Sequence, residues 1–255
     1  MSSQFRNELI ASAAEQLSRD YCCAAKDFLG LENKVTLARI ETGRRVFRDQ
    51  PDFFKAAAMG RCAVISSASE MLEFSSELAS KYSGAEIFDQ KRIWLINRKL
   101  ADYNKAIAVS NIFYLPATPY RYAAKDGFRL KFYEESEIVS ELYPIGGFSN
   151  ALMYRAGGTR RDVLAVCAFN GRRIVGMAGA SSDSPRFWQI GVDVLENYRG
   201  LGIGSELVSA LTQAVFMHGA IPYYGTWSGN IASQNTARRA GYYPVWSEMN
   251  AFDIE

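Results

Sequence analysis

Three glycines alternate with larger residues in the stretch VLENYRGLGIGSELV, which covers residues 194–208. The apolar run that ends at its start predicts a strand, and the apolar spacing that follows predicts an amphipathic helix. Glycines lack a Cβ, so backbone N–H groups can come close to an anion, and the positive end of the helix dipole points to the same place. Arg199 adds a cation with forked donors. These residues therefore predict a turn that binds an anion.

The charge pattern after the turn favours a polyphosphate as this anion. No Asp or Glu occurs between Glu206 and Glu248, so the sequence that follows the turn carries no negative side chains. Arg238 and Arg239 are available for a further phosphate. The pattern thus indicates a strand, an anion-binding turn and a helix around a polyphosphate ligand.

Other glycine turns fit these residues less well. A plain strand-to-helix turn commonly needs one glycine and seldom three. A Walker loop requires a Gly-Lys-Ser/Thr sequence that is missing here. The dinucleotide fingerprint places its third glycine one position after Gly204 and wants an acidic residue about 20 positions on. Because that acidic residue is missing too, a nicotinamide or flavin site, and with it an oxidoreductase, is disfavoured.

The turn resembles the acyl-CoA-binding signature of the GNAT superfamily of N-acetyltransferases, Arg/Gln-x-x-Gly-x-Gly/Ala. Arg199, Gly202 and Gly204 stand at its fixed positions, and Asn230 stands eleven residues ahead of Gly241. The resemblance covers about the second half of the chain. The whole chain is similar to bacterial members of the family that have an added N-terminal domain. It implies an acyltransferase that moves an acetyl group from acetyl-CoA to a primary amine of a small molecule or a peptide.

The resemblance also implies which residues hold acetyl-CoA. In this family the pantetheine arm lies between two parallel strands that splay apart, here residues 188–194 and 221–226. Backbone groups of Val192 and Val194 would bind the pantetheine amides, with Asn230 and Ser233 close by. Asn230 equally fits a plain helix N-cap. Seven consecutive amides would hold the diphosphate: Arg199, Gly200, Leu201, Gly202, Ile203, Gly204 and Ser205.

Acetyl transfer needs an amine that has lost its extra proton. Asp193, inside the strand before the turn, is the candidate base, and a surface role is its alternative. Glu196 fits a solvated turn residue better. Phe148, Asn150 and Tyr154 precede the predicted hairpin and are candidates for the acceptor site.

The leaving thiolate has no obvious proton donor. Many family members carry a tyrosine seven residues after the asparagine, where this chain has Ala237. Either another tyrosine supplies the proton, or the thiolate leaves unaided, since a free thiol has a pKa of about 8.5. The tyrosines that are candidates for this proton donor are Tyr223, Tyr224 and Tyr242. Ala237 also keeps a second function open, that of a non-catalytic acyl-CoA sensor or scaffold.

The predicted elements support a mixed α/β protein. In the second half, Asn170-Gly171 predicts a tight hairpin, and strands and helices then follow in the order β-β-β-α-β-α-β, which fits helices packed on a mixed sheet of GNAT type. In the first half, the pattern predicts a smaller α+β domain. Its expected helices are residues 6–17, 69–82 and 90–100, and its expected strands are residues 35–40, 61–67 and 106–115.

Two prolines in LPATPY predict a linker, which divides the chain into domains 1–116 and 117–255. The first domain is expected to cap the acceptor pocket, to form a homodimer or to enlarge the core, and the sequence does not choose among these. The acceptor itself is also left open.

Composition limits the expected partners and the expected cellular location of the protein. The chain has 255 residues, 48% hydrophobic and 22% charged, with a net charge of +2, so neither nucleic acid nor a membrane is an expected partner. The polar N-terminus lacks the apolar core of a signal peptide. Four cysteines without metal spacing indicate reduced thiols in the cytoplasm and no metal site. His218 fits a helix end, Cys167 inert packing, and Trp227 either packing or an acceptor pocket.

Overall fold

The computed structural model describes residues 2–119 and 127–254, which form two compact units. The N-terminal unit contains residues 7–113, 226–229 and 244–255, and the C-terminal unit contains residues 1–6, 114–225 and 230–243. Strands β5 (Ser110–Pro116) and β11 (Tyr242–Asn250) contribute residues to both. The linker predicted at LPATPY begins inside β5, and its Tyr120 lies outside the described residues. The domain division at residue 116 stays a prediction.

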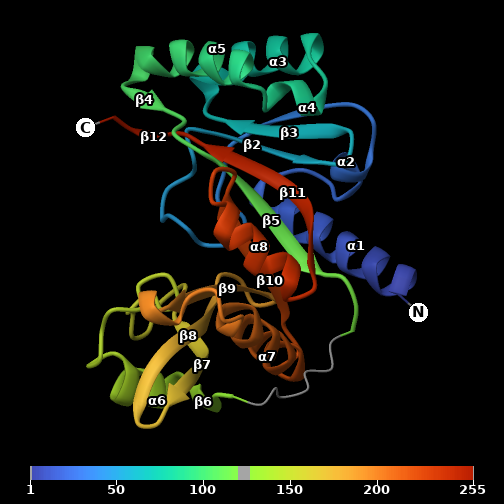
Figure 1. Cartoon of the computed structure of the whole chain (residues 1–255). Helices are drawn as coiled ribbons and strands as arrows, with labels where there is room; N and C mark the ends of the chain where they lie inside the picture. The colour runs from blue at the N-terminus through green and yellow to red at the C-terminus, as the bar shows by residue number, and fades with distance from the viewer. Residues whose placement is uncertain (1, 120–126, 255) are drawn as a thin grey trace. The chain divides into compact units, whose positions relative to one another are not determined.

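Five strands that are neighbours in the sheet, in the order β6-β7-β8-β9-β10, form the centre of the C-terminal unit (Figure 1). These neighbours pair antiparallel except β9 and β10, which are parallel. The strands are β6 (Arg129–Glu134), β7 (Asp162–Asn170), β8 (Arg173–Ser182), β9 (Phe187–Val194) and β10 (Ile221–Trp227).

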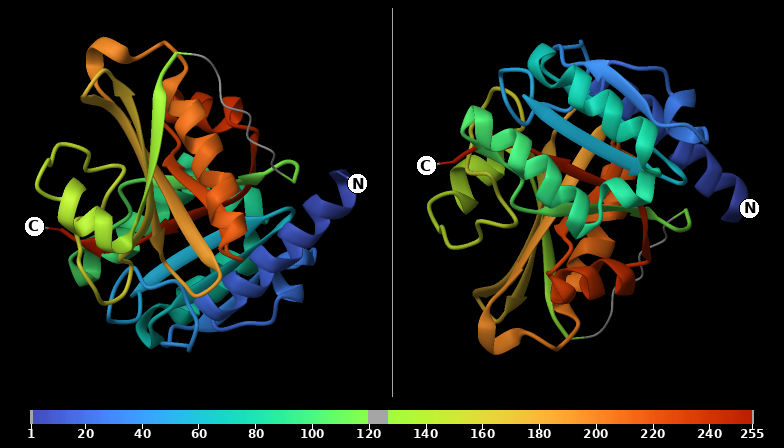
Figure 2. Two further views of the ribbon diagram at one scale, coloured as in Figure 1. Left: turned by 90° about the horizontal axis from the view of Figure 1, so that it is seen from below. Right: turned by 90° about the horizontal axis from the view of Figure 1, so that it is seen from above.

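Helix α7 (Ile203–Met217) lies along one face of this sheet, as the views in Figure 2 show. Its Ile203 and Leu207 side chains reach Gly176 of β8. Helix α6 (Glu135–Glu137) leads into the π-helical turn Ile138–Leu142. This turn and residues 148–152 cover the opposite face, and their buried side chains form one cluster with Cys167 and Met177. One face of β9 therefore lies under α7, and the other lies under residues 148–152.

The predicted strand and helix order of the second half is confirmed, with α8 (Ile231–Arg239) between β10 and β11. Gly171 turns the hairpin with a φ of +59°. Strand β6 was not predicted, because its mostly exposed, charged sequence RLKFYE contains no apolar run. Strand β2 was not predicted either, because FKAAAM is rich in alanine, which has a low β-propensity.

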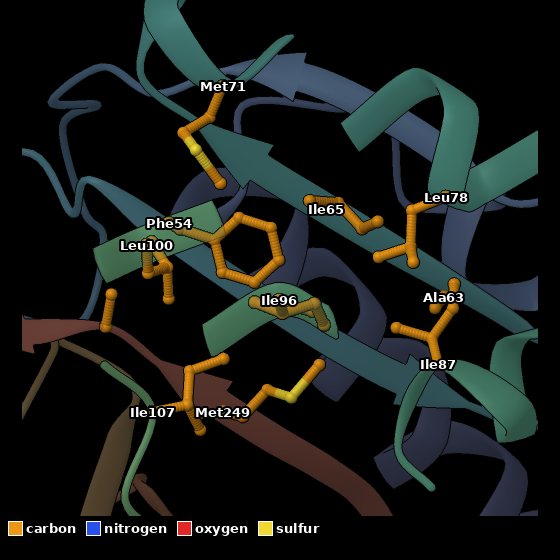
Figure 3. Close-up of a cluster of buried hydrophobic side chains, with 12 residues drawn as sticks. Phe54, Ala63, Ile65, Met71, Leu78, Ile87, Ile96, Leu100, Ile107 and Met249 are labelled. Atoms are coloured by element: carbon orange, nitrogen blue, oxygen red, sulfur yellow. The ribbon is translucent and has the colours of Figure 1, made fainter. Parts of the chain in front are cut away.

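The strands of the N-terminal unit are neighbours in the sheet in the order β1-β3-β2-β11, and the unit has its own core (Figure 3). Phe54, Ile65, Leu78 and Ile96 pack there with Met249 of β11. The helices are α1 (Ser2–Asp20), α2 (Lys26–Leu29), α3 (Leu72–Lys81), α4 (Gly84–Ile87) and α5 (Gln90–Leu100). The strands are β1 (Lys34–Leu37), β2 (Phe54–Met59) and β3 (Cys62–Ser67), besides the short pair β4 (Lys105–Ala106) and β12 (Phe252–Asp253).

The helices predicted in the first half are confirmed. Leu9, Ala13 and Leu17, whose four-residue spacing predicted the first helix, are all buried in α1. None of the helices in the described part of the chain combines the length and apolar content that crossing a bilayer requires.

Candidate functional site

The glycine turn places the N-terminus of α7 just beyond the end of β9. Gly200 and Gly202 have φ angles of +79° and +84°, which L side chains rarely adopt, and nothing lies within 4 Å of a Cβ built at either position. Gly202 is the N-cap of α7. Amides in the first turn of a helix have no acceptor inside it. Those of Ile203, Gly204 and Ser205 are therefore available to an anion.

Two hydrogen bonds fix the ends of this turn. The Nε of exposed Arg199 donates to the carbonyl of Val194 at 3.1 Å, and Oγ of Ser205 donates to the carbonyl of Gly202 at 2.8 Å. Between them, the side chain of Leu201 is 64% exposed, so its place in the turn does not depend on core packing. The turn is held by its own backbone and polar groups.

Helix α8 lies beside the first turn of α7. A Cβ built at Gly204 would be 3.5 Å from methyl carbons of Thr236 and of Val194, an ordinary contact. Arg238 and Arg239 follow Thr236 in the last turn of α8 and are exposed. The cations predicted for a further phosphate thus stand on the helix that borders the glycine turn.

Strands β9 and β10 separate part of the way along their length. Their pairing runs from Phe187↔Ile221 to Ile190↔Tyr224 and ends there. Strand β9 continues, still paired with β8 as far as Val194. Among the described residues, β9 therefore has an open edge from residue 191 to residue 194 on the side of β10.

The backbone of Val192 and Val194 faces this open edge. The amide of Leu195 donates to the carbonyl of Val175 in β8 at 2.9 Å. Backbone groups in a strand point to its two sides in turn, so those of Val192 and Val194 point away from β8. They are oriented to bind an extended ligand as an added strand would be bound.

Asn230 and Ser233 lie at the start of α8, next to the point where the strands separate. Asn230 is the N-cap, because its Oδ1 accepts from the amide of Ser233 at 3.1 Å. The hydroxyl of Ser233 bonds to that of Tyr224 at 2.8 Å, and Tyr224 is the last residue of β10 paired with β9. Burial raises the pKa of Tyr224 above its ordinary value of 10.0, so the phenol keeps its proton at neutral pH.

Asp193 holds residues 148–152 against the sheet. Its Oδ2 accepts from the amides of Asn150 at 2.7 Å and Ala151 at 3.1 Å, and its Oδ1 accepts from Nδ2 of Asn150 at 2.6 Å. A carboxylate offers about four acceptor positions. These bonds occupy three of them, so one lone pair on Oδ1 remains for a proton or a water.

Two glycines let this segment approach the sheet so closely. Gly179 of β8 and Gly191 of β9 are paired, and a Cβ at these positions would lie 2.1 Å and 1.8 Å from the carbonyl oxygens of Ala151 and Asn150. Neither glycine was predicted as a functional residue. A glycine inside a predicted strand, as in the sequence IGVDV, is a signal of close backbone approach that could have found Gly191.

The other two tyrosines are bound to buried partners. The hydroxyl of Tyr223 donates to the carboxylate of Asp183, which also accepts from Arg160 at 2.9 Å. The hydroxyl of Tyr242 bonds to Thr212 at 2.6 Å. Tyr224 is therefore the tyrosine whose hydroxyl bonds to the start of α8, where the strands part.

The acceptor-site candidates have structural contacts. Phe148 is 4% exposed, and its amide donates to the hydroxyl of Tyr154 at 3.1 Å. Asn150 binds Asp193, as described above. Glu196 is exposed, in accord with a solvated turn residue. None of these contacts identifies the acceptor.

The remaining interpretations concern single residues. Cys167 is fully buried, and burial raises its pKa to about 12, which confirms inert packing. His218 lies at the end of α7, where its Nδ1 is 2.9 Å from the carbonyl of Ala214, which confirms a helix-end residue. Trp227 is 50% exposed and packs against Gly229. Within the described residues, no group of three His, Cys, Asp or Glu side chains could hold a metal.

Part of the chain matches a known family. Residues 130–242 match the model of the acetyltransferase (GNAT) family. This range holds the glycine turn, the open edge of β9 and the N-cap of α8. No curated protein matches the chain.

Solved structures of similar description match part of the chain. A GNAT-family protein from Novosphingobium aromaticivorans matches with 13% identity and a TM-score of 0.44, over 58% of this chain and 66% of its own. A GNAT-family acetyltransferase from Colwellia psychrerythraea has 17% identity and a TM-score of 0.42, with 62% of each chain covered. A GCN5-related N-acetyltransferase from Kribbella flavida has 18% identity and a TM-score of 0.46, over 61% of this chain and 62% of its own. The match spans less than two thirds of each of these proteins.

Proposed function

We propose that this chain, whose residues 130–242 form a domain of the acetyltransferase (GNAT) family, transfers an acetyl group from acetyl-CoA to a primary amine. The observation that carries the proposal is the coincidence of two features at one end of β9. An open strand edge and a helix N-terminus with available amides adjoin each other there. The open strand edge suits an extended chain of amides, and the helix N-terminus suits a diphosphate. CoA contains both of these groups in one molecule.

The backbone would provide most of the binding of CoA. Amides from residue 199 to residue 205 would hold the diphosphate, with the charge of Arg199 beside them. The N–H and C=O groups of Val192 and Val194 would bond the pantetheine amides, and the carbonyl of Val194 would exchange its present bond with Arg199 for one with the ligand. Asn230 and Ser233 would border the pantetheine at the start of α8.

Acetyl-CoA supplies a thioester, whose carbonyl carbon an amine can attack. Asp193 is the proposed base, and its remaining lone pair on Oδ1 would accept the amine proton directly or through a water. A backbone amide near Val194 would stabilise negative charge on the carbonyl oxygen. The acceptor would be a small-molecule or peptide amine, and the expected setting is the bacterial cytoplasm.

Tyr224 is the proposed proton donor for the thiolate. Its raised pKa keeps the proton in place through neutral pH, so loss of the donor is expected only above pH 10. The Tyr224→Phe variant should lower kcat by about tenfold or more and remove the alkaline limb of the pH–rate profile. Tyr242→Phe is the matched control, because its hydroxyl bonds to Thr212 within the core. Equal rates in the two variants would exclude Tyr224 and leave unaided departure.

A non-catalytic acyl-CoA sensor is the alternative function. Ala237 stands where many family members have the proton donor, and three of the four acceptor positions of Asp193 are already used. Calorimetric titration with CoA and a free-thiol release assay with acetyl-CoA and a panel of amines separate the two. Binding together with thiol release supports the enzyme. Tight binding without release across the panel would support the sensor, and absence of binding would refute both.

A further inference from the structure

The N-terminal unit contains a cavity of about 240 Å³. It is lined by the end of α1, the segment from Arg44 to Asp52, and residues of β2, β5 and β11. The parts of β5 and β11 concerned, Asn111 to Phe113 and Glu248 to Asn250, belong to this unit. The cavity is smaller than a typical site for a drug-sized ligand, which suits a molecule of amino-acid size or less.

A buried ion-pair network forms one wall. Arg45, 3% exposed, donates from Nε to Asp20 at 2.6 Å and from Nη2 to Glu248 at 2.5 Å. Glu248 also accepts from Nε1 of Trp246, and Asp20 also accepts from the amide of Arg45. Asp20 thus accepts three hydrogen bonds from protein donors, and Oε1 of Glu248 accepts two. The positive charge of Arg45 offsets part of the negative charge of these two carboxylates.

The hydroxyl of Tyr21 is a buried donor on the same cavity. Tyr21 is 1% exposed, and its Oη has no hydrogen-bond partner among the described residues. Burial is the main reason why the pKa of Tyr21 is well above its ordinary value. The charges of Glu248 and Asp52 raise this pKa further and that of Arg45 lowers it, and all three residues line the cavity. A buried donor without an acceptor costs stability, so this hydroxyl indicates an acceptor atom that the protein itself does not supply.

Positive charge exceeds negative charge around the cavity. Four of the lining side chains are cations and three are carboxylates. Arg44 donates to the carbonyls of Arg45 and Arg48, at 3.2 Å and 2.5 Å, and these neutral partners leave its charge uncompensated. The rings of Phe47 and Phe113 add apolar surface. The lining thus combines an excess of donors and positive charge with space for a carbon skeleton.

We propose that this cavity binds a small organic carboxylate, with the carboxylate toward Tyr21 and Arg44 and the carbon skeleton against Phe47 and Phe113. The site is independent of the acetyltransferase proposal, because every residue in it belongs to the N-terminal unit. A carboxylate offers acceptor oxygens to the phenol and balances the excess charge.

The proposal is tested with three probes of one shape, benzoate, benzamide and benzylamine, on the full chain. Calorimetric titration should show benzoate binding, with benzamide at least about tenfold weaker because it lacks the charge, and no binding of benzylamine. Benzoate should also raise the Tm. If benzylamine binds as well as benzoate, or if none of the three binds, the proposal is wrong.

The variant Tyr21→Phe separates a ligand contact from a structural role. Loss of the hydroxyl should weaken benzoate about tenfold while the Tm of the free protein stays equal or rises, since a donor without a partner has been removed. Tyr103→Phe is the control in the same unit, because that hydroxyl donates to the carbonyl of Glu70 at 3.5 Å and does not line the cavity. A lower Tm with unchanged benzoate affinity in Tyr21→Phe would show that a buried water satisfies the hydroxyl, and would overturn the proposal.

A second variant tests the charge. Arg44→Gln keeps a donor for the neighbouring carbonyls and removes the positive charge, so benzoate should bind at least about tenfold more weakly and benzamide about equally. Equal losses for both probes would contradict a carboxylate site.

Discussion

The glycine turn before α7 and the centre of the C-terminal sheet both depend on glycine, for opposite reasons. At Gly202 the backbone has a φ of +84°, and the space where a side chain would be is open. At Gly191 the backbone is an ordinary strand, and the carbonyl oxygen of Asn150 lies where a Cβ would be. One region needs glycine for its conformation and the other needs it for its packing.

This difference separates ligand binding from architecture. The turn leaves amides and open space on the surface, which is what an incoming diphosphate requires. The centre of the sheet uses its glycines to hold residues 148–152, and Asp193 completes that attachment with three hydrogen bonds. Substitutions in the two regions should therefore have distinct effects, one on affinity for CoA and the other on stability.

Gly191→Ala should have the largest effect. The added Cβ would lie 1.8 Å from the carbonyl oxygen of Asn150, so the segment must move or the sheet must open. We expect the free energy of unfolding to fall by about 3 kcal/mol, measured by urea denaturation. Unchanged stability would mean that residues 148–152 do not pack on β9 as described.

Asp193→Asn should weaken the same attachment. Asparagine keeps one oxygen that can accept from the backbone amides of Asn150 and Ala151, but its NH2 group cannot accept from Nδ2 of Asn150 and the negative charge is lost. Stability should therefore fall by about 2 kcal/mol. The Kd for CoA should stay nearly the same. If Asp193 is the base, turnover falls. An undiminished rate removes it from the mechanism, and Glu196→Gln, an exposed neighbour, is the control.

Gly202→Asp should act mainly on the ligand. The left-handed backbone costs an L residue about 1 kcal/mol, least for Asp and Asn. A negative charge at the N-terminus of α7 should weaken CoA at least about tenfold, measured by calorimetric titration. Gly202→Asn is the matched control, because it has nearly the same shape without the charge. Equal affinities of Asp and Asn variants would contradict diphosphate binding at the turn.

Gly204→Ala should have the smallest effect. The Cβ would make ordinary contacts at 3.5 Å with Thr236 and Val194, and alanine favours a helix more than glycine does. Stability should change by less than about 1 kcal/mol, with nearly the same affinity for CoA. A large loss of stability here would show that the third glycine is required by packing, like Gly191.

Sequence alone determined the features that depend on a few neighbouring residues. The hairpin at Asn170-Gly171, the turn at Gly202 and the N-cap at Asn230 follow from backbone angles and hydrogen bonds within each segment, so their residue types predict them. The family signature lies in the same kind of segment. Periodicity likewise predicted most helices, because the burial of α1 and α7 repeats along the chain.

Tertiary structure decided what joins distant segments. The end of the β9–β10 pairing at Tyr224, the bonds between Asp193 and Asn150, and the place of residues 244–255 in the N-terminal unit depend on which surfaces meet after folding. The isolated Tyr21 hydroxyl is another such result. The type of a residue determines which bonds its side chain can form. Its partner is determined only by the packing of segments that are far apart in the sequence.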